Sequence, residues 1–167
     1  MISMTSSATS STPIDNLDTT DRRILLELED DPRLPVVLLA QRLGLARGTV
    51  QARLDRLTAR GVLLPHSVRV TPSALGRPIR AIVTAELDQR EFKESMNALG
   101  SIPEVLECAA ISGGSDLFLQ VVARDPDHLY QVSQLILSCP GIRRTATSLI
   151  LRDLIPFRTT PLLEEQV

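Results

Sequence analysis

Arginine is concentrated in one segment of this chain, in a pattern that suits the binding of a polyanion. Between residues 33 and 80 there are nine arginines, one acidic residue and no lysine, so this segment has a net charge of +8, although the whole chain has a formal net charge of −2. The nine are Arg33, Arg42, Arg47, Arg53, Arg56, Arg60, Arg69, Arg77 and Arg80. A basic segment inside an acidic protein indicates a nucleic acid as the partner.

Within this segment, the residues from about Arg47 to Arg60 are predicted to form a helix with two different faces. Val50, Leu54 and Leu57 recur at helical spacing and would face a core. On the opposite face, small residues leave room for a major groove, polar residues can contact base edges, and flanking arginines can neutralise phosphates. A solvated, arginine-rich helix is the alternative for such a pattern in isolation. The predicted DNA-binding residues are Arg47, Gly48, Thr49, Gln51, Ala52, Arg53, Arg56 and Arg60.

Two shorter helices are predicted before this one and would position it. Asp18 can cap a first helix, which Pro32 would stop. A second helix over residues 35–43 would end at Gly44, and the short turn that follows leads into the third helix. The three helices therefore make a helix-turn-helix, and the apolar residues within 62–70 predict a short strand-like wing after it.

The second half of the chain alternates between strand and helix periodicity. Strands are predicted over residues 79–87, 105–111, 117–123 and 142–151, and helices over about 92–99 and 129–136. The order βαββαβ is that of the ferredoxin-like sandwich, an antiparallel sheet with both helices on one face. The expected fold class is α+β, with an N-terminal winged helix-turn-helix domain and a C-terminal ferredoxin-like βαββαβ sandwich.

Composition shifts along the chain predict where these domains begin and end. Residues 1–16 are rich in Ser and Thr without apolar periodicity, which predicts a disordered leader. The stretch with two prolines and a glycine near residue 75 predicts a linker. The expected organisation is a leader over 1–16, the helix-turn-helix domain over 17–70, the linker over 71–78, the second domain over 79–155 and a C-terminal tail over 156–167.

A loop between two strands of the second domain carries residues suited to a small ligand. It consists of Ser112, Gly113, Gly114, Ser115 and Asp116. Its two glycines allow unusual dihedral angles and expose backbone N–H groups, which could hold a carboxylate, while Asp116 could accept a hydrogen bond from an ammonium group. A plain hairpin turn is the alternative, and from the residues alone it is favoured.

Several classes of protein are excluded or disfavoured by what the sequence lacks. It shows no secretory signal and no apolar run long enough for a membrane, so we expect a cytoplasmic protein. With two cysteines, Cys108 and Cys139, and two distant histidines, His66 and His128, it has no spacing typical of a disulfide framework or a metal site. No nucleophile paired with a base stands out. We therefore expect neither an enzyme nor a cofactor.

Three stretches of the sequence resemble the Lrp/AsnC (feast/famine) family of bacterial and archaeal transcription regulators. They are LDTTDRRILLELEDDPRLPVVLLAQRLGLARGTVQARLDRLTARGVL, SGGSDLFLQVVA and PGIRRTATSLILRDLI, and the resemblance covers about residues 17–155. The front stretch is fairly specific, because an additional N-terminal helix, the helix-turn-helix and the Arg-x-x-x-Leu pattern occur together.

This resemblance implies a function for each domain. The first would bind double-stranded DNA, and the second would sense a ligand and form homodimers, sheet against sheet, that assemble into tetramers or octamers. An amino acid or related metabolite would bind between dimers near the loop at 112–116. Thr145 and Thr147 match threonines of the family and could line the same pocket. The implied function is a sequence-specific transcriptional regulator modulated by such an effector.

The chain also departs from the family pattern in the loop. Gly114 and Ser115 stand where the family usually has an acidic and an aromatic residue, so one carboxylate that could hold an ammonium group is missing. A ligand-independent architectural DNA-binding protein is therefore an alternative. A less favoured one is an enzyme like the sirohaem decarboxylases, which resemble this family in domain order.

Overall fold

The computed structural model describes residues 17–165, which form two compact units. One unit contains the residues up to Leu64 and again those from Phe157 onward, and the other is Pro65–Pro156. The leader predicted for residues 1–16 lies outside the described residues. Each unit is described below by itself.

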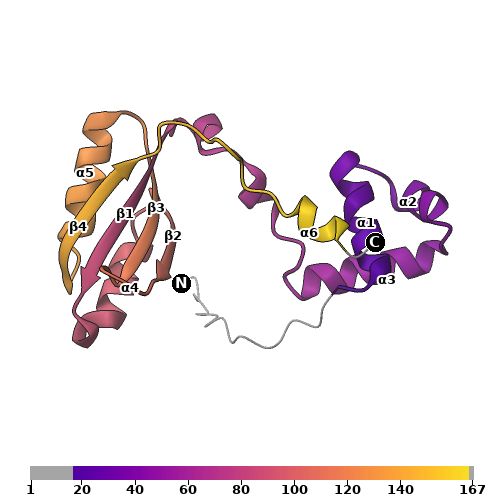
Figure 1. Cartoon of the computed structure of the whole chain (residues 1–167), viewed down its shortest axis with the longest axis horizontal. Helices are drawn as coiled ribbons and strands as arrows, with labels where there is room; N and C mark the ends of the chain where they lie inside the picture. The colour runs from indigo at the N-terminus through magenta and orange to yellow at the C-terminus, as the bar shows by residue number, and fades with distance from the viewer. Residues whose placement is uncertain (1–16, 166–167) are drawn as a thin grey trace, which may run out of the picture. The chain divides into compact units, whose positions relative to one another are not determined.

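Three helices form the body of the first unit, as the sequence predicts (Figure 1). They are α1 (Thr19–Asp30), α2 (Val36–Leu43) and α3 (Arg47–Ala59). The side chain of Asp18 caps α1 by accepting a hydrogen bond from the backbone N–H of Asp21 at 2.8 Å. Gly44 ends α2 in the left-handed conformation, with φ of 67°, which glycine adopts at little cost. Ile24, Leu39 and Val50, one from each helix, are fully buried in the core between them.

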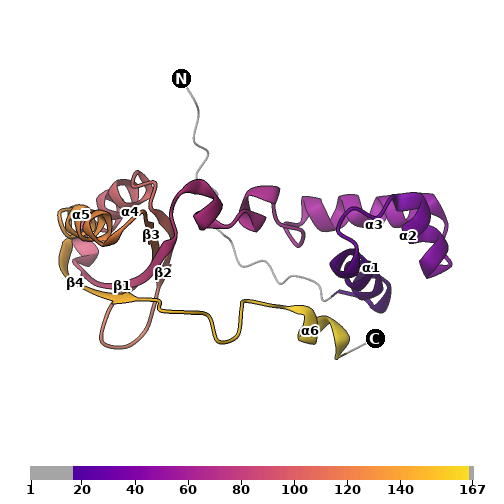
Figure 2. The ribbon, with the colours of Figure 1, turned by 90° about the horizontal axis from the view of Figure 1, so that it is seen from above.

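A fourth helix completes this unit, and the sequence pattern did not predict it. Helix α6 (Thr160–Glu164) lies beside α1 in both views (Figures 1 and 2). Arg22 of α1 donates a hydrogen bond from Nη1 to the backbone oxygen of Leu162 at 2.6 Å. Five residues are too few to show a helical period, and the sequence predicts only a tail over 156–167.

The strand-like wing expected within residues 62–70 is absent from the described structure. The segment instead holds a 3-10 helix, His66–Arg69, and a second one follows at Pro72–Leu75 in the predicted linker. Val68 and Val70 donate backbone hydrogen bonds to the oxygens of Pro65 and Ser67, at 3.1 and 3.2 Å. These local turns use the backbone groups that a strand ladder would need, so the apolar alternation at these two valines was misleading.

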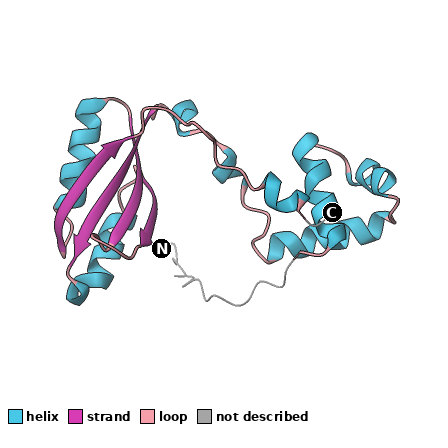
Figure 3. Ribbon diagram, viewed as in Figure 1, coloured by secondary structure: helices cyan, strands magenta, loops and turns pink. Residues whose placement is uncertain are grey.

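The second unit is the predicted ferredoxin-like βαββαβ sandwich (Figure 3). Its four strands pair in the order β2-β3-β1-β4, and every pairing is antiparallel. Strand β1 is therefore central although it comes first in the chain. The elements are β1 (Ile79–Leu87), α4 (Phe92–Gly100), β2 (Val105–Ala110), β3 (Leu117–Ala123), α5 (Pro126–Leu137) and β4 (Ile142–Leu149), with a short 3-10 helix, Gln89–Glu91, before α4.

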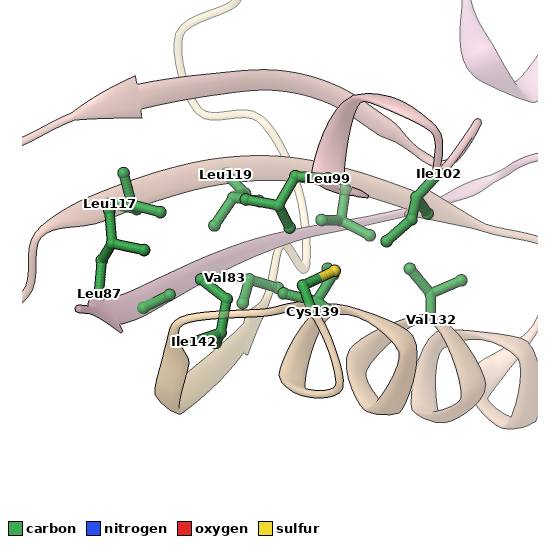
Figure 4. Close-up of a cluster of buried hydrophobic side chains, with 12 residues drawn as sticks. Val83, Leu87, Leu99, Ile102, Leu117, Leu119, Val132, Cys139 and Ile142 are labelled. Atoms are coloured by element: carbon green, nitrogen blue, oxygen red, sulfur yellow. The ribbon is translucent and has the colours of Figure 1, made fainter. Parts of the chain in front are cut away.

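The core of this unit lies between the sheet and its two helices, which cover the same face (Figure 2). Val83 and Leu119 from the central strands and Val132 and Ile136 from α5 are almost fully buried there, and the close-up in Figure 4 shows part of this cluster. Alternate residues of the same strands point to the opposite face of the sheet. Neither α4 nor α5 covers that face.

Candidate nucleic-acid interface and effector site

Helix α3 has the two faces that its sequence predicts. Val50 and Leu57 are completely buried, and Leu54 is partly buried against the same core. The opposite side is exposed to solvent and carries most of the predicted DNA-binding residues. The exposed ones are Arg47, Gly48, Thr49, Gln51, Ala52, Arg56 and Arg60. The polar face is therefore available to a partner and is not consumed by packing within the unit.

Gly48 lies on this exposed face, and the fold does not explain why a glycine stands at this position. A Cβ atom added there would meet nothing within 4 Å, and the backbone of Gly48 has no positive φ. Glycine inside a helix costs about 0.5–1 kcal/mol relative to alanine. Neither packing nor backbone geometry requires a glycine here, and its small size suits close approach of a partner to the helix.

The side chain of Gln51, one of the residues predicted to contact a base, is held in one orientation. Its Nε2 donates to Oδ1 of Asp55 one turn later, at 2.8 Å. Side chains four residues apart on a helix are neighbours, so this hydrogen bond restricts the rotamers of the amide. Both residues are exposed. This hydrogen bond also fixes the direction of the amide oxygen of Gln51. The spacing of Gln51 and Asp55 in the sequence permits the contact but does not establish it.

Arg53 and Arg56 were predicted to neutralise phosphates, but both form ion pairs with acids of their own unit. Nη1 of Arg53 lies 2.6 Å from Oδ2 of Asp18 and 2.7 Å from Oδ1 of Asp21. Nη2 of Arg56 lies 2.8 Å from Oδ2 of Asp21. The Arg53 side chain is only 24% exposed, whereas that of Arg56 is 47% exposed. We therefore revise the expectation for Arg53, which is bound within its own unit.

The ion pairs of Arg53 also perturb the ionisation of its partner. Its guanidinium, hydrogen-bonded to the carboxylate, holds the pKa of Asp18 below the usual value, although burial opposes this effect. The same hydrogen bond, followed by the one to Asp21, raises the pKa of Arg53. A charged partner favours the charged form of each group, so both shifts are consequences of the ion pair.

The basic segment as a whole is less basic at its surface than its sequence suggests. Five of its nine arginines form ion pairs with acids of the described chain that lie outside the segment. Arg33, Arg47, Arg60 and Arg69 are exposed. The pairs are Arg42 with Glu27, Arg53 with Asp18 and Asp21, Arg56 with Asp21, Arg77 with Glu104, and Arg80 with Asp153.

In the second unit, the predicted effector loop is a short turn anchored by Asp116. Its Oδ2 accepts from the backbone N–H of Leu87 at 2.7 Å, and its own N–H donates to the oxygen of Ala85 at 3.0 Å. Gly113 has φ of 131°, a conformation that favours glycine. One oxygen of Asp116 is therefore used to hold the loop against β1, which weakens the expectation that this carboxylate receives an ammonium group.

An open hollow of about 250 Å³ lies beside this loop. It brings together three predicted effector residues, Gly114, Ser115 and Thr145, but Ser112, Gly113, Asp116 and Thr147 are not part of its lining. Thr147 instead lies 3.2 Å, oxygen to oxygen, from the hydroxyl of Ser133 on α5. The remaining lining residues are Thr84, Glu86, Arg144 and Ala146.

Sequence reasoning missed the charged residues of this hollow. Glu86 and Arg144 face each other across β1 and β4 in the strand register, and Oε1 of Glu86 lies 3.9 Å from Nη1 of Arg144. Both side chains are well exposed, at 45% and 78%. They are far apart in sequence, and only the pairing of β1 with β4 brings them together. An anion and a cation side by side could bind a zwitterion.

The described residues also show whether the chain could hold a metal ion, form a disulfide or cross a membrane. They contain no group of three or more His, Cys, Asp or Glu side chains that could hold a metal ion. Both cysteines are free thiols. His66 is exposed in a 3-10 helix, and Nδ1 of His128 accepts from the backbone N–H of Arg124 at 3.2 Å. No helix in the part of the chain that the structure describes is long and apolar enough to cross a membrane.

Comparison with known proteins agrees with this geometry in both units. Residues 17–63 match the winged helix-turn-helix DNA-binding domain, and residues 80–160 match the Lrp/AsnC ligand binding domain. The chain is 33% identical to the HTH-type transcriptional regulator AldR of Mycolicibacterium smegmatis, over 83% of this chain and 84% of that protein.

Two solved structures extend the similarity to the fold. E. coli AsnC is 25% identical with a TM-score of 0.77, covering 88% of this chain and all of that one. A Neisseria meningitidis transcriptional regulator in complex with L-Met is 25% identical with a TM-score of 0.72, covering 84% and 93%. The chain, in which a winged helix-turn-helix domain precedes a ligand binding domain in the sequence, belongs to the Lrp/AsnC family of DNA-binding transcriptional regulators.

Proposed function

We propose that this protein is a homo-oligomeric transcription regulator that reads duplex DNA with α3 and responds to an amino acid. The observation that carries the DNA-reading part is the exposed face of α3, where Gly48, Thr49, Gln51 and Ala52 lie away from the buried Val50 and Leu57. Exposed Arg47 at the start of the helix supplies a cation for a phosphate. The cytoplasm is the compartment in which such a regulator would meet DNA.

The uncovered face of the sheet suits the assembly of two copies. Ile82 and Phe118 lie on this face, because they alternate with the residues that point toward α4 and α5. Burying this face against its copy would form a homodimer with two reading helices. Such a dimer binds a pseudo-palindromic site with half-sites about one helical turn apart. Tetramers or octamers would form from these dimers.

The effector that the hollow suits best is a free amino acid. Glu86 can accept hydrogen bonds from an α-ammonium group and Arg144 can bind an α-carboxylate in two places, so a zwitterion satisfies both charges. The N. meningitidis relative in complex with L-Met supports this class of ligand. Thr145 and Ser115, at the edge of the hollow, add hydroxyl groups. Glu86 would replace the acid that the loop lacks at Gly114.

The DNA-binding part is tested by recovering the genomic fragments that the purified protein binds. A shared sequence motif with two half-sites is expected among them, and the genes beside it would suggest the metabolite that is sensed. Recovery of fragments without a common motif would contradict sequence-specific regulation and favour an architectural role.

The effector part is tested with a thermal-shift screen of the twenty amino acids, because a ligand of the folded state raises the melting temperature. Glu86→Gln and Arg144→Gln should each abolish the shift that the best amino acid produces. Arg143→Gln is the matched control, since Arg143 neighbours Arg144 but pairs with Asp88, and it should keep the shift. No shift with any amino acid would overturn this part and favour ligand-independent DNA binding.

A further inference from the structure

A buried carboxylate of α1 holds two arginines of the DNA-reading helix. Asp21 is 2% exposed and lies on the first turn of α1. Its Oδ1 accepts from Nη1 of Arg53 at 2.7 Å and from Nη2 of Arg56 at 3.1 Å, and its Oδ2 accepts from the same nitrogen of Arg56 at 2.8 Å. Both oxygens are thus engaged by α3, and a buried acid is compensated by two guanidinium groups.

The two arginines are spaced to control the orientation of α3. Arg53 and Arg56 are three residues apart and lie on one side of the helix, almost one turn along its axis. Arg53 also reaches Asp18, the cap of α1, at 2.6 Å. Contacts at two levels add directional resistance to rotation and sliding of α3, beyond the packing of its apolar stripe. The residues next to these arginines, Gln51 and Ala52, are the ones predicted to meet the bases.

We propose that Asp21 is a positioning residue for DNA recognition, and that Arg53 serves this contact and is not a phosphate ligand. Asp21 fixes the angle at which α3 presents its exposed face, and hence the register of Gln51 on a base pair. This inference rests on the proposed DNA-reading function of α3. Its consequence is that the acid increases affinity for the preferred sequence, although a negative charge near DNA would by itself reduce binding.

The test compares Asp21→Asn with Glu27→Gln in the full-length protein. Glu27 is also on α1 and pairs with an arginine, Arg42 of α2 at 3.0 Å, so its variant removes one carboxylate without touching α3. Affinity is measured on a duplex selected by the wild-type protein from a random pool and on a scrambled duplex of equal length, across a series of salt concentrations. Failure of the wild type to select any sequence would reject the proposed function and not this inference alone.

For Asp21→Asn we expect the ratio of specific to scrambled affinity to fall by about tenfold or more, the size of a lost base contact. The salt dependence should not become weaker, because no phosphate contact is removed. Glu27→Gln should keep the wild-type ratio. If Asp21→Asn instead raises affinity on both duplexes with a steeper salt dependence, Asp21 only screens the arginines from DNA and the proposal is wrong.

Arg53 provides a second test if Asp21→Asn does not fold. Loss of a true phosphate contact reduces the slope of log K against log salt by about 0.9. Arg53→Gln should lower the specificity ratio and leave the slope unchanged, and Arg53→Lys, which keeps one ion pair, should restore part of the ratio. A slope reduced by about one charge in Arg53→Gln would show a direct phosphate contact and contradict the inference.

Discussion

At the scale of single residues, α3, the helix proposed to read DNA, contains residues that favour accessibility over helix stability. Gly48 is a poor helix former placed where a methyl group would meet no other atom of the described chain. Ala46 occupies the cap position of α3 without a side-chain hydrogen bond. Natural proteins keep such unfavourable choices mainly at functional sites. Both residues lie at the end of α3 that is expected to enter the groove.

The first prediction concerns Gly48→Ala. It should stabilise the protein by about 0.5–1 kcal/mol, because alanine loses less backbone entropy in a helix and meets no neighbour here. Gly48→Leu should fold equally well but bind DNA much more weakly, because the larger side chain blocks approach of the groove. Urea unfolding and fluorescence anisotropy with a labelled duplex measure the two effects. Undiminished binding by Gly48→Leu would remove this residue from the interface.

Gln51 allows a prediction about sequence preference. Gln51→Ala should reduce the affinity for the preferred duplex by about 1–3 kcal/mol, as expected for loss of a two-point base contact, and change binding to a scrambled duplex little. Competition between the two duplexes measures this directly. Equal loss on both would mean that Gln51 does not read a base.

At the scale of elements, the periodicity of apolar residues predicted most helices and strands. It did not predict which side chains of different elements contact one another. The four strands and α4 and α5 were predicted because their apolar alternation or helical spacing is long and regular. Helix α6 was missed because it has five residues. The pairing of Asp21 with Arg53 and Arg56 was missed because an acid on a first turn also suits the helix dipole, and sequence alone does not distinguish the two roles.

The same limit applies to the two candidate sites. The exposed residues of α3 follow from one helical period, so most of them could be identified from sequence. The hollow beside the loop depends on the register of β1 with β4, which brings Glu86 to Arg144. No pattern within a single segment encodes that neighbour relation.

The link between α1 and α3 should make stability depend on pH. The pKa of Asp18 is lowered in the folded state by its hydrogen bond to Arg53, so the stabilisation is complete above the unfolded pKa of about 3.9 and is lost as the pH falls through the folded value. Asp18→Asn keeps a good helix cap but loses the ion pair. The unfolding free energies of the wild type and Asp18→Asn should therefore converge as the pH is lowered from 6 to 2.5. A constant difference would contradict the assignment.

The open face of the sheet gives a prediction about assembly. Phe118 lies on the face that α4 and α5 leave uncovered, and its side chain has no role in the core of the unit. Phe118→Asp should leave the monomer folded but place a charge in the centre of the proposed dimer interface, which strongly disfavours association. Light scattering should then report a monomer in place of a dimer or larger assembly. An unchanged oligomeric state would show that copies associate through another surface.

At the scale of the whole molecule, the chain passes from the first unit through the second and then returns. Residues from Phe157 onward belong to the first unit, where α6 packs on α1 and Arg22 binds the backbone of Leu162. Two connections therefore join the units, one before β1 and one after β4. The second connection continues directly from the strand that carries Thr145 and Arg144, which line the hollow.

Deletion of residues 157–167 should consequently destabilise the first unit. Loss of the α6 contacts, on the order of 1 kcal/mol, would lower the melting temperature of a unit of this size by about 4–8 °C. The second unit contains none of the deleted residues and should melt as before. Hydrogen exchange read separately on α1 and on β1 resolves the two units, and equal protection of α1 in both proteins would show that α6 adds nothing.

The position of α6 also sets an order of events during synthesis. A ribosome makes the three helices α1, α2 and α3 of the first unit first and the second unit next. Only then does it make α6, which packs on α1. In a nascent chain the first unit therefore lacks α6 until that helix leaves the exit tunnel. Only chains translated through Glu164 can form the contacts between α1 and the whole of α6, so prematurely ended products lack them.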